Sequence, residues 1–312
     1  MPVRHQTTLA SAASCRGVGL HTGAPVGLTL RPAPAGTGIV FVRADGAGDQ
    51  RPIPARYDLV VGTTLCTTLG FDDGPTVGTV EHVMAALVGL GVDNATLDVD
   101  GPEVPVMDGS AGPFVELIDR AGITQLDAPR RVLRITRAVK VADGARTASL
   151  LPADGFAVSM ALAYDGPPIG RQDATFQITA DVFRRDIAPA RTYGFLDEIA
   201  ALRGRGLARG GSLDNAIVIS GASVLNEEAL RFPDEFVRHK ILDGIGDLAL
   251  AGAPIIGHFT GQATGHALNQ ALLRALFADP SAYVYETAGE TAGVAAADGA
   301  LAPWELARAA TA

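Results

Sequence analysis

The chain has 312 residues, of which 47% are hydrophobic and 19% are charged, and its formal net charge is −9. Such a length predicts two domains, because single cores rarely grow past a few hundred residues. The acidic balance argues against nonspecific nucleic-acid binding, which needs a dense basic surface, although a few local basic side chains can still bind a small anion.

The cysteine content and the apolar runs indicate the compartment. Cys15 and Cys66 are too few for a disulfide framework and indicate reduced thiols in a cytosolic protein. The N-terminus has no apolar signal core, and no apolar run reaches the roughly 18 residues that a membrane span needs. We therefore expect a cytoplasmic monomer without stable membrane insertion, which can still visit a membrane surface to meet its substrate.

The first half of the chain is predicted to form short strands around one apolar helix. Alternating apolar residues predict strands over 26–31, 38–42, 65–69 and 95–99. A helix is predicted from Thr79, as its N-cap, to Gly89 or Gly91. A second helix is predicted over 114–121.

A segment at 127–131 is predicted to link two domains, 1–127 and 128–286. The second domain is predicted to have strands over 132–135, 148–151, 157–162 and 254–259, with helices over about 233–250 and 265–277. The Ala/Gly-rich tail at 287–312 is expected to be loose apart from a turn near Trp304.

Short similarities between the halves favour a duplicated domain. Residues 29–33 are similar to residues 149–153, and residues 92–95 are similar to residues 213–216. In each half, a helix that carries a histidine leads through a glycine into an apolar strand. The predicted fold is α+β, with two similar two-layer domains, each with a small insertion, and a site at their interface.

Three polar side chains share one stripe of the mostly apolar helix near residue 240. His239 and Asp243 lie four positions apart and project from one face, and Asp247 lies one turn further along. Buried charges need partners. For this helix taken alone, a His–Asp pair that caps a surface is an equally good interpretation.

The adjacent residues Glu81 and His82 interrupt the apolar helix of the first half. Neighbouring helix positions point about 100° apart, so one of the two can ligate a metal while the other reaches the metal's water. His82, His239 and Asp243 would form a three-ligand set with a position left open for water, which is typical of catalytic zinc. The same set would accept Fe²⁺.

His266 follows Gly265 at the start of the last predicted helix. A lone histidine at such a position is more often a polar residue of the helix start. A hydrolase that expels a poor leaving group needs a proton donor, however, and histidine is the usual one. Asp247 is suited to orient and charge this imidazole.

Several motifs in order resemble the UDP-3-O-acyl-N-acetylglucosamine deacetylases, the zinc amidases of lipid A (lipopolysaccharide) synthesis in Gram-negative bacteria. They lie at residues 17–23, 79–82, 107–110, 190–195, 225–227, 232–247 and 265–269. The resemblance implies that His82, His239 and Asp243 bind zinc. It implies that Glu81 is the general base for the attacking water.

The resemblance assigns the other residues to charge stabilisation and substrate contact. His266, supported by Asp247, would stabilise the intermediate or protonate the departing amine, and the Thr192 hydroxyl would help to stabilise the oxyanion. Lys240 would contact the sugar–diphosphate part of the substrate. The residues implied to bind the substrate are Lys240, Thr192, Tyr193 and Cys66.

The implied reaction removes the acetyl group from UDP-3-O-(3-hydroxyacyl)-N-acetylglucosamine and gives the free amine and acetate. An insertion near 195–221 is expected to form the passage for the acyl chain. Tyr193 stands where family members often have Phe.

Two other function classes stay open at this point. One is a metal-free acid/base dehydratase that uses Glu81 and His266. The other is a non-catalytic binder of a sugar nucleotide or lipid. The metal content of the purified protein separates the dehydratase from the metal hydrolase, and turnover separates both from the binder.

Overall fold

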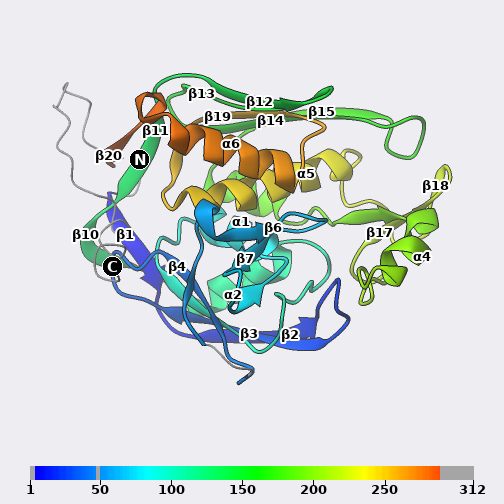
Figure 1. The fold of residues 1–312 in the computed structure, drawn as a ribbon, viewed down its shortest axis with the longest axis horizontal. Helices are drawn as coiled ribbons and strands as arrows, with labels where there is room; N and C mark the ends of the chain where they lie inside the picture. Colours follow the sequence, from blue (N-terminus) through cyan, green and yellow to red (C-terminus); the bar gives the residue numbers. More distant parts are fainter. Residues whose placement is uncertain (1–3, 47–49, 289–312) are drawn as a thin grey trace.

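Two mixed β-sheets enclose a central layer of helices, as the ribbon of the computed structural model shows (Figure 1). The structure describes residues 4–46 and 50–288, so the turn predicted near Trp304 lies outside the described residues. The α+β class predicted from the sequence is confirmed.

The first sheet has five strands in the order β2-β3-β9-β4-β5. Its centre is β9, which runs antiparallel to β3 and parallel to β4. Alternate residues such as Leu28, Leu30 and Phe41 are fully buried, because the period of two along a strand turns one face towards the helices. The strands are β2 (Ala13–Val18), β3 (Pro25–Pro32), β4 (Ile39–Arg43), β5 (Ile53–Pro54) and β9 (Ala95–Val99). The first-half helices are α1 (Glu81–Gly89) and α2 (Gly112–Ala121).

The second sheet has seven strands, and β19 lies at its centre. β19 runs antiparallel to β13 and parallel to β14 and β11. The strands are β11 (Arg131–Ile135), β12 (Val139–Asp143), β13 (Arg146–Leu151), β14 (Phe156–Ala163), β15 (Arg171–Gln177), β19 (Ile255–Gln262) and β20 (Tyr283–Thr287). The helices α5 (Glu235–Leu248) and α6 (His266–Ala278) belong to this half.

Five strands of the second sheet repeat the order of the first. The path β12-β13-β19-β14-β15 has the same relative strand directions as β2-β3-β9-β4-β5. This match supports the proposal of a duplicated domain. The similarity of 29–33 to 149–153 falls on the equivalent strands β3 and β13. The similarity of 92–95 to 213–216 does not support it, because the first segment leads into β9 and the second into β17, whereas the counterpart of β9 is β19.

Smaller elements join and flank the two sheets. β1 (His5–Leu9) pairs with β10 (Ile123–Pro129), so the segment predicted as a linker at 127–131 lies where strand β10 gives way to β11. A second small sheet contains β6 (Val60–Gly62), β7 (Thr68–Gly70) and β8 (Thr76–Val77). The strand predicted over 65–69 is wrong for its first part, because Leu65 adopts a left-handed φ of 62° and β7 begins only at Thr68.

The remaining elements surround the second half. The segment predicted as its insertion, 195–221, includes α4 (Leu196–Gly204) and β17 (Ile217–Ser220), which project to one side with β18 (Ser223–Val224) (Figure 1). β16 (Tyr193–Phe195) pairs with β17. The short helical turns are η1 (Tyr57–Leu59), α3 (Ala180–Val182), η2 (Phe183–Ile187), η3 (Ala249–Ala251) and η4 (Pro280–Ala282).

Helices α1 and α5 pack directly against each other between the sheets (Figure 1). Gly246 of α5 permits this approach, since a Cβ at this position would lie 2.0 Å from the carbonyl oxygen of Glu81. The predicted N-cap of α1 is wrong: Thr79 has a φ of 55°, its hydroxyl donates to Glu103, and Val80 occupies the cap position without a side-chain hydrogen bond. The first turn of α1 therefore packs against the C-terminal part of α5 at Gly246.

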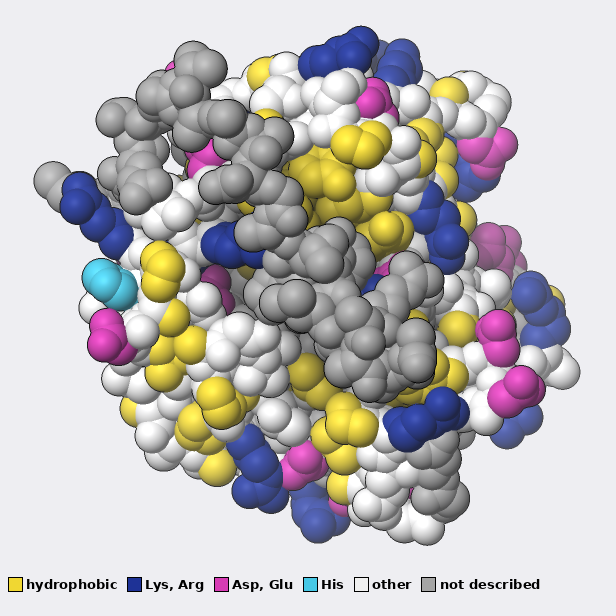
Figure 2. Space-filling view, turned by 60° about the vertical axis from the view of Figure 1, so that its left-hand side comes forward, with side chains coloured by type: hydrophobic (Ala, Val, Ile, Leu, Met, Phe, Trp, Pro, Cys, Tyr) yellow, Lys and Arg dark blue, Asp and Glu magenta, His cyan; other side chains and the backbone are white. Residues whose placement is uncertain are grey.

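On the face shown in Figure 2, Lys and Arg side chains occur in small groups among acidic and uncharged residues. This face lacks the dense basic surface that nonspecific nucleic-acid binding needs. Among the helices of residues 4–46 and 50–288, none has the length and hydropathy to cross a membrane.

Candidate metal centre and active site

Three buried side chains from the two central helices converge on one point. The Nε2 atoms of His82 and His239 lie 3.6 Å and 3.4 Å from Oδ1 of Asp243. Potential ligand atoms of all three residues lie within 4.8 Å of one another. Tetrahedral ligands about 2.1 Å from one zinc ion are separated by about 3.4 Å. The spacing therefore fits three ligands of a single ion.

The protonation of this group favours a cation. His239 donates from Nδ1 to the carbonyl of Ala190 at 3.0 Å, which leaves the lone pair of Nε2 facing Asp243. Burial lowers the pKa of His239 to about 4, so its imidazole is neutral at pH 7. Lone pairs of a neutral imidazole and a carboxylate that face each other are stabilised by a bound metal ion.

Asp243 stays ionised despite its burial. Burial alone would raise its pKa, but attraction to His239, which is protonated at the low pH where this carboxyl titrates, and to Lys240 holds the pKa of the carboxyl well below its usual range. Lys240 donates from Nζ to Oδ2 of Asp243 at 2.7 Å, on the oxygen that does not face the histidines. Lys240 thus neutralises part of the charge of this carboxylate and leaves Oδ1 available.

A second buried cluster contains the predicted acid and base. Nε2 of His266 lies 3.9 Å from Oε1 of Glu81, and its Nδ1 lies 2.9 Å from Oδ2 of Asp247. Asn269 also donates to Oδ2 of Asp247, at 2.8 Å. Thr67 connects the two carboxylates: its backbone N–H donates to Glu81 at 3.0 Å and its hydroxyl donates to Asp247 at 2.6 Å.

The pKa shifts of this cluster place a proton on His266. Burial opposes its charge, but the carboxylates of Asp247 and Glu81 outweigh burial and raise the pKa of His266 to about 9. Burial raises the pKa of Glu81 above its ordinary value, although the charge of His266 acts in the opposite direction. A charged donor and a base of raised pKa therefore lie side by side, as proton transfer near pH 7 requires.

Three residues predicted to bind the substrate surround this centre less closely. Tyr193 stacks edge-on against Phe236 at 5.0 Å and against His239 at 6.4 Å, measured between ring centroids. Thr192 precedes it, and its backbone is held by hydrogen bonds with Gly109 and Ile217, each 2.8 Å long. Cys66 is buried beside Thr67, and burial together with the charge of Glu81 raises the pKa of its thiol to about 11. The thiol of Cys66 is therefore uncharged at pH 7.

Sequence reasoning missed the residues that hold the site from the loops. No sequence motif marks Thr67 or Glu103, which is buried and accepts hydrogen bonds from His21, Thr22 and Thr79. His21 belongs to the motif at 17–23, from which no role for it follows. Backbone N–H groups make half of these contacts, and side-chain spacing along the sequence gives no signal of such groups.

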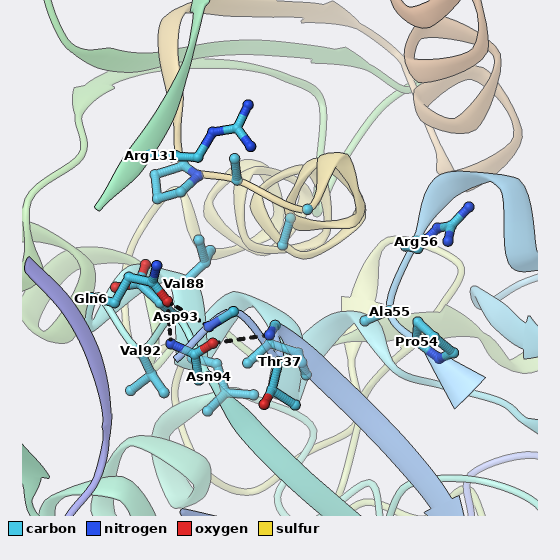
Figure 3. Close-up of a pocket in the computed structure, with 18 of the residues that line it drawn as sticks. Gln6, Thr37, Pro54, Ala55, Arg56, Val88, Val92, Asp93, Asn94 and Arg131 are labelled. Atoms are coloured by element: carbon cyan, nitrogen blue, oxygen red, sulfur yellow. Dashed lines mark hydrogen bonds between the residues drawn. The ribbon is translucent and has the colours of Figure 1, made fainter. Parts of the chain in front are cut away.

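A separate cavity of about 160 Å³ lies near the other end of α1. Its walls include Met84, Leu87 and Val88 of α1 and Ala249 beyond α5. Figure 3 shows Asn94 at this cavity, bonded to Gln6 and to the backbone of residue 38. No residue predicted for the site lines this cavity, so it is not the candidate active site.

Comparisons with known proteins identify the family of this chain. The chain matches the protein family described as UDP-3-O-acyl N-acetylglycosamine deacetylase over residues 6–278. It is 53% identical to the UDP-3-O-acyl-N-acetylglucosamine deacetylase of Myxococcus xanthus, with 89% of this chain and 88% of the relative covered. The enzymes of that name from Phenylobacterium zucineum and Acidithiobacillus ferrooxidans are 51% and 52% identical, over 91% and 82% of this chain and 97% and 84% of the relatives. The chain therefore belongs to the UDP-3-O-acyl N-acetylglycosamine deacetylase family.

Proposed function

We propose that this protein is a zinc-dependent deacetylase that hydrolyses the acetamide of UDP-3-O-(3-hydroxyacyl)-N-acetylglucosamine in lipid A synthesis, in the cytoplasm. The family membership supports the reaction and the substrate class. The observation that carries the mechanism is the convergence of His82, His239 and Asp243 beside the Glu81–His266 pair. Residues 1–127 would supply Glu81 and His82. Residues 128–286 would supply His239, Asp243 and His266.

The metal would be held by His82, His239 and Asp243, whose donors suit Zn²⁺ and also Fe²⁺. When bound, such an ion lowers the pKa of water to about 7 and polarises a carbonyl oxygen. Both histidines are buried and one is held neutral by that burial, which suits ligands that must present a lone pair.

Glu81 would accept the proton of the attacking water. Its Oε2 is fixed by the N–H of Thr67, so Oε1, which faces His266, remains for this transfer. His266 carries the positive charge that stabilises the developing oxyanion and can donate its Nε2 proton to the departing amine. Asp247 holds the opposite nitrogen of the ring and keeps Nε2 directed at the reacting atoms.

Lys240, Thr192, Tyr193 and Cys66 would bind the substrate around this centre. Lys240 and Tyr193 lie on the side of Asp243 and His239, where a sugar–diphosphate would meet one cation and one aromatic ring. The hydroxyl of Thr192 would assist the oxyanion. The segment 195–221 would receive the acyl chain.

The experiment that tests this function combines metal analysis with turnover. The purified protein should contain about one zinc or iron per chain, lose deacetylation after exhaustive chelation and regain it when Zn²⁺ is added. The 3-O-acylated UDP-N-acetylglucosamine should be deacetylated much faster than UDP-N-acetylglucosamine without the acyl chain. Undiminished turnover by the chelated protein would exclude the mechanism and favour metal-free acid/base chemistry. Substrate binding without turnover would favour the non-catalytic binder.

A further inference from the structure

The loop that contains His21 is tied to the buried carboxylate of Glu103. Oε1 of Glu103 accepts the backbone N–H of His21 at 3.0 Å, the N–H of Thr22 at 2.9 Å and the Thr22 hydroxyl at 2.8 Å. Oε2 accepts the hydroxyl of Thr79 at 3.2 Å. Glu103 is only 3% exposed, so these neutral donors solvate a charge that water does not reach.

The glycine beside this loop is required by the same carboxylate. A Cβ on Gly19 would lie 1.8 Å from Oε1 of Glu103, so only glycine permits the carboxylate to sit under the loop. The other side of the loop contacts the second half of the chain. The N–H groups of Arg209 and Gly210 donate to the carbonyls of His21 and Leu20 at 3.1 Å and 3.0 Å. The loop is thus held between Glu103 and the segment proposed to receive the acyl chain.

One buried nitrogen of the His21 side chain needs a hydrogen-bond partner. Its Nδ1 accepts the N–H of Ala208 at 3.4 Å, which makes Nε2 the protonated nitrogen of the neutral ring. Nε2 is buried and has no hydrogen-bond partner among the described residues. Burial lowers the pKa of His21, and the positive charge of His266 lowers it further although Glu103 opposes both, so His21 is a neutral donor near His266. A buried unpaired N–H costs free energy unless an acceptor meets it.

We propose that Glu103 is the positioning residue of His21, and that it holds the Nε2–H of His21 where this group donates a hydrogen bond to an oxygen of the bound substrate. The proposal rests on the proposed deacetylation. It adds a substrate contact from the first half of the chain, whereas Lys240 and Tyr193 belong to the second half. Glu103 itself does not touch the substrate. It acts through the backbone of residues 21 and 22.

The test is a double-mutant cycle between Glu103 and His21. Glu103→Gln keeps the size of the side chain but removes the charge and places an N–H₂ group among donors. It should raise KM and lower kcat/KM by about tenfold or more, because hydrogen bonds to a charged group are lost. His21→Ala should give a similar loss. In the His21→Ala background, Glu103→Gln should change kcat/KM less than about twofold, since the residue that it positions is gone.

A second double-mutant cycle tests the hydrogen bond between Glu103 and Thr79. Thr79→Val removes the hydroxyl that bonds Glu103 next to α1. If Glu103 acted through α1 and Glu81, its effect would vanish in the Thr79→Val background and persist in the His21→Ala background, and the proposal would be overturned. Glu103→Gln could instead lower kcat/KM by the same factor in both backgrounds and also reduce the bound metal. That result would indicate a purely structural role and would also overturn the proposal.

Two further measurements keep the proposal testable if one variant folds poorly or if the reaction differs. Glu103→Asp keeps the charge but shortens its reach, so it should show the same KM effect at an unchanged zinc content. Hydrogen exchange of the amides of His21 and Thr22 should accelerate in both Glu103 variants, whatever reaction the protein catalyses. Slow exchange in these variants would refute the positioning role. Failure of wild-type deacetylation with accelerated exchange in the variants would instead refute the proposed function alone.

Discussion

Nε2 of His266 and Oε1 of Glu81 face each other at 3.9 Å within a buried cluster of ionisable side chains. Their pKa values are both raised, but for different reasons: burial dominates for Glu81, and the two neighbouring carboxylates dominate for His266. The pair is therefore a proton donor and a proton acceptor whose balance depends on Asp247.

The alkaline limit of activity should follow His266. Because its raised pKa lies at about 9, deacetylation that needs the charged imidazole should persist to about pH 9 and fall as the ring loses its proton. Asp247→Asn removes a negative charge that favours the protonated ring, so it should move this limit to lower pH by about one unit or more. The pH profile of kcat/KM measures the shift, with Asn269→Ala as a control that leaves the charge in place. A limit that stays fixed in Asp247→Asn would assign it to another group.

Glu81→Gln should abolish most of the turnover while it leaves the metal in place. General-base catalysis contributes about 10²–10⁴-fold, and kcat should fall by this order. The carboxamide can still accept the N–H of Thr67, so the structure of the site should be retained. Zinc analysis and single-turnover kinetics on the same sample check both statements. A kcat within a few-fold of the wild type would remove Glu81 from the role of base.

Both proposed histidine ligands should be required for metal binding. His82→Ala and His239→Ala should lower the metal affinity by more than the 10- to 100-fold that follows from changes in residues around metal ligands. Competition with a coloured chelator measures this affinity without any reference to activity. His258→Ala serves as a matched control, because His258 lies on β19 and pairs with Ser159 outside the cluster. Equal affinity in all three variants would contradict the assigned ligand set.

Thr67→Val should weaken catalysis by about tenfold, since it removes a 2.6 Å hydrogen bond to the Asp247 carboxylate but keeps the backbone N–H that binds Glu81. The loss should appear together with a shift of the His266 titration. Thr64→Val is the control, because it makes the same change of residue type at another position of the same loop. If Thr67→Val had no effect on either quantity, the Thr67 hydroxyl would have no part in positioning Asp247.

Gly246→Ala should destabilise the protein by about 1–3 kcal/mol and reduce metal affinity, because the new Cβ would overlap the carbonyl of Glu81. Gly204→Ala is the control, since a Cβ there meets no atom within 4 Å. Denaturant unfolding with and without zinc gives both values. A Gly246→Ala protein as stable as the control would show that α1 and α5 can separate freely.

The sequence predicted best what helical periodicity determines. His239, Asp243 and Asp247 could be placed on one stripe of α5 because positions four apart share a face. The structure turns His239 and Asp243 towards His82 of α1, and Asp247 towards His266 of α6. The pattern of strands likewise predicted the α+β class.

The sequence predicted poorly what depends on backbone donors and unusual φ angles. Thr79 looks like an N-cap by residue type, but its left-handed φ turns its hydroxyl towards Glu103. Leu65 has the same kind of conformation and ends a strand that its apolar neighbours predict. Thr67 and Glu103 form part of their contacts with backbone N–H groups, which no side-chain pattern marks.

The contact of α1 with α5 at Gly246 gives the proposed metal a second consequence. His82 comes from one helix and His239 and Asp243 from the other, so an ion bound by all three binds only when the helices are in contact. Any ligand that binds one arrangement alone stabilises it in proportion to the logarithm of the free ligand concentration. Free zinc would then add to the stability of the contact between the two halves.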